Sequence, residues 1–440
     1  MYLFYVQEPL FLIKEPVVGA RRGLSYRPRL CSATTAHASS SSGPCVRLMP
    51  PANGVLTADT LFAAFSFPLL KQLGAFSKEV ERPSLIRLLS DRDQKRTLSL
   101  PGMPIRLGAG KPGDPSLETQ LDGASLRRHP RIALLNPFGF ALGDTIVALS
   151  TIREFQRRLE QRVGAIQLDV LQHPDNVETE ELYLQSGLVR AVYHLPVPLS
   201  FLAQYDAYVD FSSDIVSRRL CWVDDMLEML GIDHTSVPAQ RKRNSLTIQP
   251  SAVGSLAARI ARLRSRASPI VLFHGSASEG IRSMPESLMR TFLEEILERT
   301  DWIVVSVHPV PVRHSRVLDW SSLSTSFQRF AYVISQMDAF LCVDTCVYHV
   351  ADAFDVPGVV LFTTVPPHLR TPRYPGVHGI LLGGETNKLA GPQRAQVDEP
   401  AYVGSLWAEL DVGGVVRSLQ DVVAVRRGSS PDVAVMANCR

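Results

Sequence analysis

The chain has 440 residues, of which 45% are hydrophobic and 20% are charged, and its formal net charge is +3 at pH 7. This length and composition predict two or three globular domains, and the small net charge excludes a general nucleic-acid-binding protein. The six cysteines, of which only Cys342 and Cys346 are close in sequence, form no pair of Cys-x2-Cys motifs, so we expect reduced thiols in a reducing compartment, the cytoplasm, and no metal site.

Residues 1–128 are predicted to form an N-terminal extension that is flexible in part. Residues 1–18 begin as an apolar stretch, but three charged residues interrupt it and no basic segment leads it, so we expect neither a signal peptide nor a membrane span. Residues 32–42 are rich in Ser, Ala and Thr and typical of a mobile segment, residues 56–76 contain a helix-like apolar stretch, and the Gly/Pro-rich residues 101–113 indicate a linker. An accessory cap and a partly disordered tail are both open as roles for this region.

From residue 131 onward, strand-like and helix-like patterns alternate. The first series has strands at 132–136, 166–171, 191–194 and 207–211 and helices at 144–160, 178–187 and 217–230. The second series has strands at 270–274, 302–307, 339–343 and 358–362. Such alternation predicts the α/β class, with two tandem doubly wound parallel sheets over residues 129–250 and 268–390. Ligands of such sheets bind outside the carboxyl ends of the strands.

The first turn of interest follows the strand at 132–136. Gly139 to Asp144 form a predicted turn, and the helix after it carries apolar residues along one side. Asp144 can therefore be a helix N-cap, a catalytic carboxylate that accepts a proton, or both at once.

A second turn, rich in small hydroxyl residues, follows the strand at 270–274. Ser276 and Ser278 would let a ligand approach the backbone, and Arg282 precedes a helix that Pro285 opens. An arginine in this place can contact two phosphate oxygens at once. The alternative for this loop alone is a solvated turn whose arginine keeps it soluble.

A third turn follows the strand at 339–343. Apolar residues from Val347 onward predict a helix with Asp344 or Thr345 as its N-cap, and a strand-to-helix turn of this kind attracts phosphate. His349 lies one turn beyond Thr345, so a hydroxyl, backbone amides and an imidazole can meet one anionic ligand. The alternative is an ordinary N-cap beside a surface histidine, but two such turns in adjacent units favour an anion site.

These motifs resemble one known family. The segments are Gly275-Ser276-Ala277-Ser278, Arg282-Ser283-Met284-Pro285 and Asp344-Thr345-Cys346-Val347-Tyr348-His349. They resemble the donor half of glycosyltransferase family 9, the ADP-heptose:lipopolysaccharide heptosyltransferases. Gly143-Asp144-Thr145 resembles the start of the acceptor domain of that family, and the resemblance covers about residues 131–390.

Three residues depart from the family pattern. Arg282 stands where the family has Lys, and Cys346 where it has Gly. His308 follows a strand after which the family often has a Glu near the nucleotide ribose. The resemblance therefore implies the class of donor more securely than the identity of the donor. Two alternatives remain: a non-catalytic sugar-nucleotide or glycan binder, and a sugar-nucleotide epimerase of similar fold.

The resemblance implies a GT-B fold of two Rossmann-like domains, the first on the acceptor side and the second binding the nucleotide sugar. It implies that residues 391–425 pack back on the first domain and that 426–440 form a tail. The implied activity is transfer of a sugar, heptose in this family, from a nucleotide-diphosphate donor such as ADP-heptose to a glycan, lipopolysaccharide-type or protein acceptor. The implied location is the cytoplasm.

The resemblance also implies roles for particular residues. Asp144 is the implied general base. The implied donor-binding residues are Ser276, Ser278, Arg282, Asp344, Thr345, Cys346 and His349. No paired carboxylates follow either donor-domain strand, so we expect no metal and no cofactor besides the donor substrate. A cluster of basic residues at Arg259, Arg262, Arg264 and Arg266 is compatible with solvated surface and also with peripheral contact to the inner face of a membrane, where a lipid-linked glycan acceptor would lie.

Overall fold

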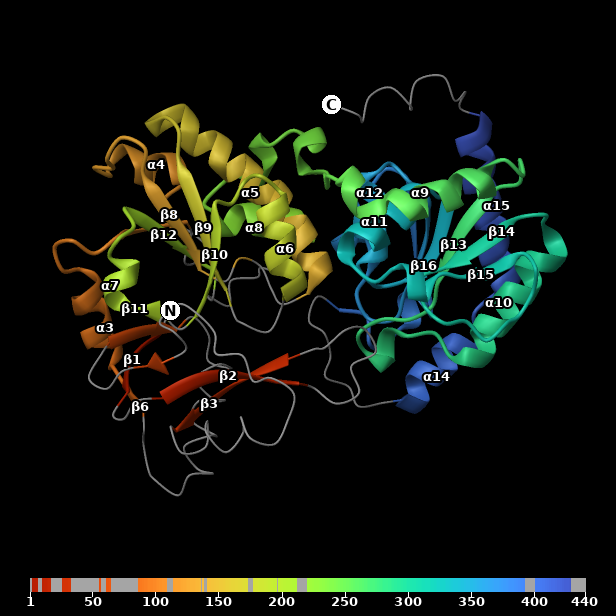
Figure 1. Cartoon of the computed structure of the whole chain (residues 1–440), viewed down its shortest axis with the longest axis horizontal. Coiled ribbons are helices and arrows are strands. Elements are labelled where there is room, and N and C mark those ends of the chain that lie inside the picture. Colours follow the sequence, from red (N-terminus) through yellow and green to blue (C-terminus); the bar gives the residue numbers. More distant parts are fainter. Residues whose placement is uncertain are drawn as a thin grey trace. The chain divides into compact units, whose positions relative to one another are not determined.

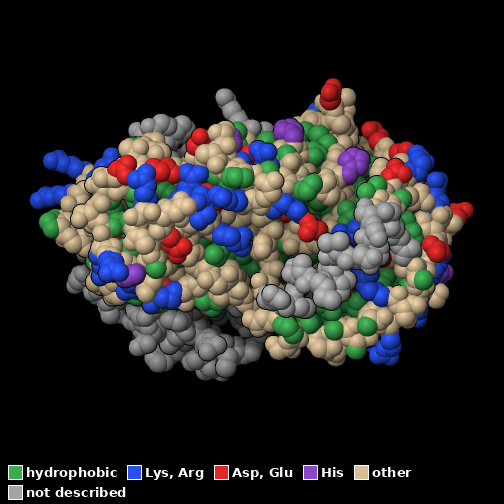
Figure 2. All heavy atoms as spheres, turned by 90° about the horizontal axis from the view of Figure 1, so that it is seen from above, with side chains coloured by type: hydrophobic (Ala, Val, Ile, Leu, Met, Phe, Trp, Pro, Cys, Tyr) green, Lys and Arg blue, Asp and Glu red, His purple; other side chains and the backbone are tan. Residues whose placement is uncertain are grey.

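The computed structural model describes residues 2–6, 10–16, 26–32, 55–56, 61–64, 86–108, 114–135, 137, 141–172, 177–195, 197–211, 220–391 and 400–428. The chain divides into two compact units, here called the first and the second unit (Figure 1). The first unit comprises Met1–Val216 and Val223–Pro238, and the second comprises Ser217–Trp222 and Ala239–Arg440. No helix within the described ranges is long and apolar enough to cross a membrane. On the face shown in Figure 2, basic and acidic side chains both occur among other residues.

The first unit contains a five-stranded parallel sheet. Its spatial order is β10 (Ala191–His194), β9 (Gln167–Gln172), β8 (Arg131–Leu135), β12 (Ala207–Asp210) and β7 (Ile105–Leu107). Four consecutive residues of β8, Ile132 to Leu135, are fully buried, as expected for a strand covered on both faces. The helices of this sheet region are α4 (Leu117–Asp122), α5 (Leu142–Val163), α6 (Val177–Gln185), α7 (Leu199–Leu202) and α8 (Trp222–Met229). The strand order reverses between β8 and β12, which makes the carboxyl ends of these two strands the topological switch point.

The described residues of the N-terminal region contain strands, and those of the predicted helix-like stretch 56–76 that are described, 56 and 61–64, lie in two of them. One sheet has the order β11 (Val197–Pro198), β5 (Leu61–Ala64), β1 (Tyr2–Val6) and β6 (Ile86–Leu88), and another has β3 (Tyr26–Ser32), β2 (Leu10–Pro16) and β4 (Val55–Leu56). Helix α3 (Asp91–Leu98) follows β6. Because β11 comes from within the predicted acceptor domain and pairs with β5, the N-terminal region shares a sheet with that domain. The predicted mobile segment 32–42 lies, apart from its first residue, outside the described residues.

The predicted linker at 101–113 contains a strand of the first parallel sheet. Strand β7 pairs in parallel with β12, with Ile105 beside Ala207. Helix α4 is anchored next to it, because the Leu117 amide donates to the Gly231 carbonyl oxygen at 2.8 Å and Gln120 binds the backbone of Gly108. The linker prediction is therefore wrong for residues 105–107. Strand β7 has only three residues, which is too short a pattern to predict a strand among neighbouring glycines and prolines.

The second unit holds a six-stranded parallel sheet. Its spatial order is β15 (Val317–Asp319), β14 (Ile303–Ser306), β13 (Ile270–His274), β16 (Ala339–Val343), β17 (Gly358–Phe362) and β18 (Val377–Leu381). Numbered in chain order, these strands lie as 3-2-1-4-5-6, the doubly wound arrangement. The switch point falls between β13 and β16. The prediction of two tandem Rossmann-like domains is confirmed.

Helices cover both faces of this second sheet (Figure 1). They are α9 (Pro250–Arg264), α10 (Glu286–Arg299), α11 (Phe327–Ser335), α12 (Val347–Ala353), α13 (Pro367–Arg370), α14 (Pro400–Ala408) and α15 (Val412–Gly428). Helices α10, α14 and α15 share one buried cluster with the strands, in which Val416 and Leu419 lie together with Leu341. The prediction that residues 391–425 pack back on the first domain is therefore wrong for residues 400–425. The apolar stripe of α15 covers the sheet face beside α10 instead.

Candidate functional site

Two of the predicted anion-binding turns lie side by side at the switch point of the second sheet. Strands β13 and β16 are hydrogen-bonded neighbours, with His274 beside Cys342 at their carboxyl ends. The Ser276 turn leaves β13 at this edge, and the Asp344 turn leaves β16. The doubly wound strand order thus brings together two loops that are separated by about 60 residues in the sequence.

Arg282 joins these two turns. Its Nη1 donates to the backbone oxygen of Asp344 at 3.1 Å and lies 3.4 Å from Asp344 Oδ2, and its Nη2 donates to Ser278 Oγ at 2.9 Å. The side chain of Arg282 remains 22% exposed. The structure therefore brings Ser278, Arg282 and Asp344 together, as the sequence predicted, and leaves the guanidinium partly open to a ligand.

Asp344 is held on both sides of its carboxylate. The residue is 4% exposed, and Tyr348 donates its hydroxyl to Oδ1 at 3.0 Å while Arg282 approaches Oδ2. Burial, and then the charge of Asp344, raise the pKa of Tyr348 well above its ordinary value, so the phenol stays protonated as a donor. Asp344 in this structure orients Arg282 and the turn.

The helix after the third turn begins later than either predicted N-cap, Asp344 or Thr345, would place it. The N-cap of α12 is Cys346, and its side chain makes no capping hydrogen bond. The prediction of Asp344 or Thr345 as the N-cap is wrong, because the Asp344 carboxylate is already engaged by Arg282 and Tyr348. Thr345 and Cys346 are both half-buried on the turn itself.

His349 is a buried residue, so the alternative of a surface histidine is wrong. It is 5% exposed, and its Nδ1 lies 2.7 Å from the hydroxyl of Tyr374. Burial, followed by the charge of Arg370, holds the pKa of His349 well below its ordinary value.

Arg370 comes from α13 at the carboxyl edge of β17, where its guanidinium stacks over the Trp222 ring at 5.3 Å. The sequence reasoning missed Arg370; its signal was a cation closely following a strand of the same parallel series.

A pair of histidines lies next to the Ser276 turn. Ser276 Oγ is 3.2 Å from His308 Nδ1, and the rings of His308 and His274 meet edge to face with centroids 5.9 Å apart. His308 follows β14, the neighbour of β13 on the other side from β16. His308, which departs from the family pattern, therefore contacts Ser276, which is predicted to bind the donor.

Asp144 lies at the switch point of the first sheet. It is the third residue of α5, half-buried, and the N-cap of that helix is Ala141, so the alternative of Asp144 as N-cap is wrong. The buried Tyr183 hydroxyl donates to the backbone oxygen of Pro137 at 2.8 Å. Burial raises the pKa of Tyr183 well above its ordinary value, a hydrogen bond with Thr145 opposes this, and the nearby charge of Asp144 adds to it. The structure thus places the half-buried Asp144 carboxylate in the first turn of α5, which follows β8 at the carboxyl edge of the sheet.

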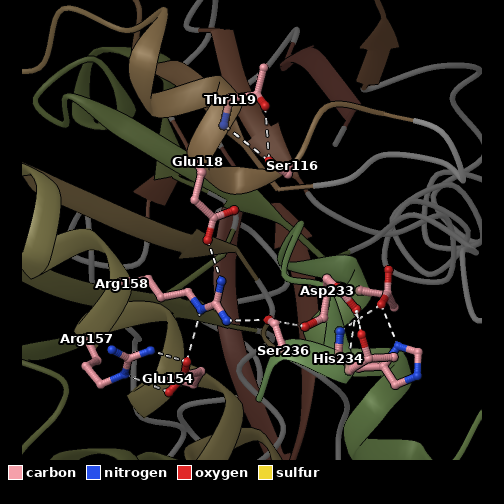
Figure 3. A network of polar contacts seen from close by, with 11 residues as sticks. Ser116, Glu118, Thr119, Glu154, Arg157, Arg158, Asp233, His234 and Ser236 are labelled. Carbon is pink, nitrogen blue, oxygen red and sulfur yellow. Dashed lines mark hydrogen bonds and ion pairs between the residues drawn. The ribbon is translucent and has the colours of Figure 1, made fainter.

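A polar network fastens α4 and the turn after α8 to α5 (Figure 3). Glu154 is 3% exposed and accepts hydrogen bonds from Arg157 and Arg158, while Arg158 also binds Glu118 and donates to Ser236 Oγ at 2.6 Å. Burial raises the pKa of Glu154, but the two arginines more than offset this, so its pKa lies below its ordinary value. Because its ion pairs and hydrogen bonds join α4, α5 and the turn after α8, we assign this network a structural role.

Three side chains at the edge of that network are close enough to share a metal ion. They are Glu228, Asp233 and His234, which are exposed or half-buried. Each of the three takes part in a hydrogen bond of the turn after α8. Asp233 accepts from the Thr235 amide at 2.8 Å, and Glu228 Oε1 lies 2.6 Å from His234 Nδ1 (Figure 3). We assign them to holding the turn.

The sequence was also compared with known families. Residues 324–394 match the model of glycosyltransferase family 9 (heptosyltransferase). The resemblance to glycosyltransferase family 9 is confirmed. The family 9 match runs from just before α11 to just after β18, so it contains Asp344, Thr345, Cys346 and His349. This family match supports the interpretation of the chain as a glycosyltransferase.

Comparison with solved structures gives the fold. The chain is similar to Escherichia coli ADP-heptose lipopolysaccharide heptosyltransferase II, with 12% identity, a TM-score of 0.50, and coverage of 68% of this chain and 99% of that one. It also matches a family 9 glycosyltransferase from Veillonella parvula at 11% identity and a TM-score of 0.48, with coverage of 69% and 99%. The first of these similarities, with the two parallel sheets, establishes a GT-B-type fold. No curated protein matches the sequence.

Proposed function

We propose that the protein transfers heptose from a nucleotide-diphosphate donor to a hydroxyl of a glycan, a lipopolysaccharide-type molecule or a protein. The observation that carries the proposal is the cluster of Ser278, Arg282 and Asp344 at the switch point of the second sheet, of which Asp344 lies in the segment that matches family 9. The similar E. coli enzyme is named for ADP-heptose, so ADP-heptose is the first donor to test.

The donor diphosphate would bind at the Ser276 and Asp344 turns. Arg282 offers a partly exposed fork of N–H donors that can contact two phosphate oxygens. Ser276 and Thr345 add hydroxyl groups, and Cys346 would lie beside the phosphate, where the family has only backbone. Negative charge grows on the leaving diphosphate as the glycosidic bond breaks, so fixed donors there stabilise the transition state.

Asp144 would act as the general base. The acceptor hydroxyl must lose its proton as its oxygen bonds to the anomeric carbon, and a carboxylate within hydrogen-bond reach can take that proton. The half-buried position of Asp144, at the carboxyl edge of the first sheet, suits this role. The proton moves to the carboxylate, and the electron pair of the broken bond leaves with the nucleoside diphosphate.

The test of the proposal is a thermal-shift comparison of ADP-, GDP- and UDP-sugars, each with and without EDTA, followed by transfer assays. A ligand at 100 times its Kd stabilises the folded state by about 2.7 kcal/mol, so the true donor should give the largest rise in Tm. We expect ADP-heptose to rank first and EDTA to change nothing, because arginine and backbone amides rather than a divalent ion hold the diphosphate.

Three results would count against this proposal. Loss of binding or transfer in EDTA, restored by one defined metal, would refute the metal-independent site. Binding of a nucleotide sugar without transfer to any acceptor would instead indicate a non-catalytic binder. Conversion of the sugar in the absence of an acceptor would indicate an epimerase.

We also propose that the enzyme works in the cytoplasm, in peripheral contact with the inner face of the membrane, through α9. Arg259 and Arg262 are exposed on this helix, and Arg266 is exposed just beyond its end. The sequence contains no acidic residue between Asp233 and Glu279 to offset them. Each basic residue near an anionic bilayer contributes about 1 kcal/mol of attraction.

Vesicle sedimentation tests this contact. Vesicles containing phosphatidylglycerol should bind the protein at low salt, and replacing Arg259, Arg262 and Arg266 by Gln should weaken binding by roughly 100-fold. Arg290→Gln, at an exposed site on α10, is the control for loss of positive charge. Equal binding by the triple variant and the wild type would reject α9 as the contact.

A further inference from the structure

The imidazole of His349 is fixed by a single hydrogen-bond partner. Its Nδ1 lies 2.7 Å from the Tyr374 hydroxyl, and its ring packs against Tyr348 with centroids 4.1 Å apart and edge-on to Tyr374 at 5.6 Å. No other described residue forms a hydrogen bond with the ring. The orientation of His349 therefore depends on Tyr374, which comes from the loop between α13 and β18.

The ring is neutral, which leaves it one N–H group. Burial and the charge of Arg370 hold the pKa of His349 well below its ordinary value, so the proton stays on one nitrogen only. If Nδ1 carried that proton, it would donate to Tyr374, and the buried tyrosine hydroxyl would have to donate elsewhere. If Nδ1 is unprotonated, it accepts from Tyr374 and Nε2 carries the proton.

The surroundings of Tyr374 favour the second arrangement. Its hydroxyl hydrogen has one acceptor within hydrogen-bond distance among the described residues, which is His349 Nδ1. Burial raises the pKa of Tyr374, and the side chain of Asn244 opposes this as a hydrogen-bond donor to the phenolic oxygen, although neither of its polar atoms makes a hydrogen bond of good geometry. A donor on the phenolic oxygen still leaves the hydroxyl hydrogen to His349. A buried hydroxyl without an acceptor is unfavourable, so Tyr374 donates to Nδ1. Asn244 Nδ2 and Oδ1 are buried polar atoms that lack a hydrogen-bond partner of good geometry, and His349 Nε2 does not belong to this group.

We infer that Tyr374 is a positioning residue: by donating to Nδ1 it holds His349 as the Nε2–H tautomer, so that Nε2 presents a neutral N–H donor to an oxygen of the bound nucleotide sugar. The inference rests on the proposed function, because the ligand is the proposed donor. The opposite tautomer would present a lone pair to the same oxygen and would repel it. Tyr374 thus acts through His349.

The tautomer can be measured without any ligand. Two-bond ¹H–¹⁵N correlation spectra distinguish a protonated Nε2 from a protonated Nδ1, and the signals of His349 among the 11 histidines are those lost in His349→Gln. We expect a single Nε2–H form in the wild type and loss of the Nδ1 hydrogen-bond shift in Tyr374→Phe. A protonated Nδ1 in the wild type would overturn the inference, whether or not the protein binds a nucleotide.

Calorimetry with ADP measures the consequence for binding. Tyr374→Phe should weaken ADP-heptose or ADP binding by roughly threefold to tenfold, the usual effect of one hydrogen bond. In the His349→Gln background the same substitution should change nothing, because a glutamine amide offers its N–H without help from Tyr374. Tyr205→Phe is the matched control: it also removes a buried hydroxyl, which bonds Asp169 in the first unit, so it should lower Tm and leave ADP affinity unchanged.

The outcomes separate this inference from the proposed function. Equal affinity of Tyr374→Phe and the wild type would refute the positioning role, even if Tm falls. A further loss in the His349→Gln background would show that Tyr374 does not act through His349. Absence of ADP binding by the wild type would contradict the proposed function, while the ¹⁵N spectra would still decide the role of Tyr374.

Discussion

Asp144→Asn is expected to lower the turnover number of sugar transfer by about 10²–10⁴-fold, the usual contribution of a general base. Asparagine keeps the size and one oxygen of the side chain but cannot accept the hydroxyl proton. Ala141 is the N-cap of α5, so the substitution removes no helix cap. The affinity for the nucleotide sugar should not change, because the proposed donor residues belong to the other unit.

The measurement is the transfer rate at saturating donor and acceptor, together with Tm and donor affinity. Glu160→Gln is the matched control, because it neutralises another acid of α5 that is exposed and bonded to Gln156. A near-wild-type rate for Asp144→Asn would reject the catalytic role. A rate that falls only in proportion to Tm would point to a structural role instead.

Arg282→Ala is expected to weaken the binding of ADP and ADP-heptose by about 1.5–3 kcal/mol, or roughly 10- to 150-fold in Kd. Arg282 is the charged side chain that bridges both turns, and its loss removes a charge-assisted hydrogen bond to the diphosphate. Arg282→Lys should fall between wild type and alanine, since lysine keeps the charge and loses the planar fork.

Arg282 also neutralises Asp344, so the test must separate the two effects. In Arg282→Ala, the nearly buried carboxylate keeps only Tyr348 as its side-chain partner. Combining Arg282→Ala with Asp344→Asn removes that uncompensated charge, and binding should remain weak if Arg282 contacts the ligand itself. Recovery of wild-type Kd in the double variant would mean that Arg282 acts only on Asp344. Arg290→Ala on α10, an exposed arginine, is the control for loss of positive charge.

The central strands were predictable from sequence because their apolar runs are continuous. The strands at 270–274, 339–343 and 358–362 begin and end where the sequence predicted. Strands β15 and β18, at the edges of the second sheet, were not predicted. The side chains of β18 stay partly exposed, and β15 has only three residues, so neither has the continuous apolar run of a buried strand.

The packing partners of segments were not predictable. The resemblance implied a C-terminal segment that packs back on the first domain, whereas α15 shares a buried cluster with α10 and the strands of the second sheet. In the same way, the strand at 105–107 becomes stable only because β12 offers it an open edge. Tertiary contacts decide both, since neither segment has a strong local preference of its own.

At the candidate site, the sequence by itself determined the residue types and the turns that carry them: Ser278, Arg282 and Asp344 were all named from their spacing after two strands. Only the tertiary structure decided what each side chain does. The parallel pairing of β13 with β16 brings Arg282 onto Asp344, which therefore does not cap α12. The loop before β18 brings Tyr374 onto His349, which is thereby buried and oriented. Hydrogen bonds between residues far apart in the chain depend on strand order and burial, and a local sequence pattern contains neither.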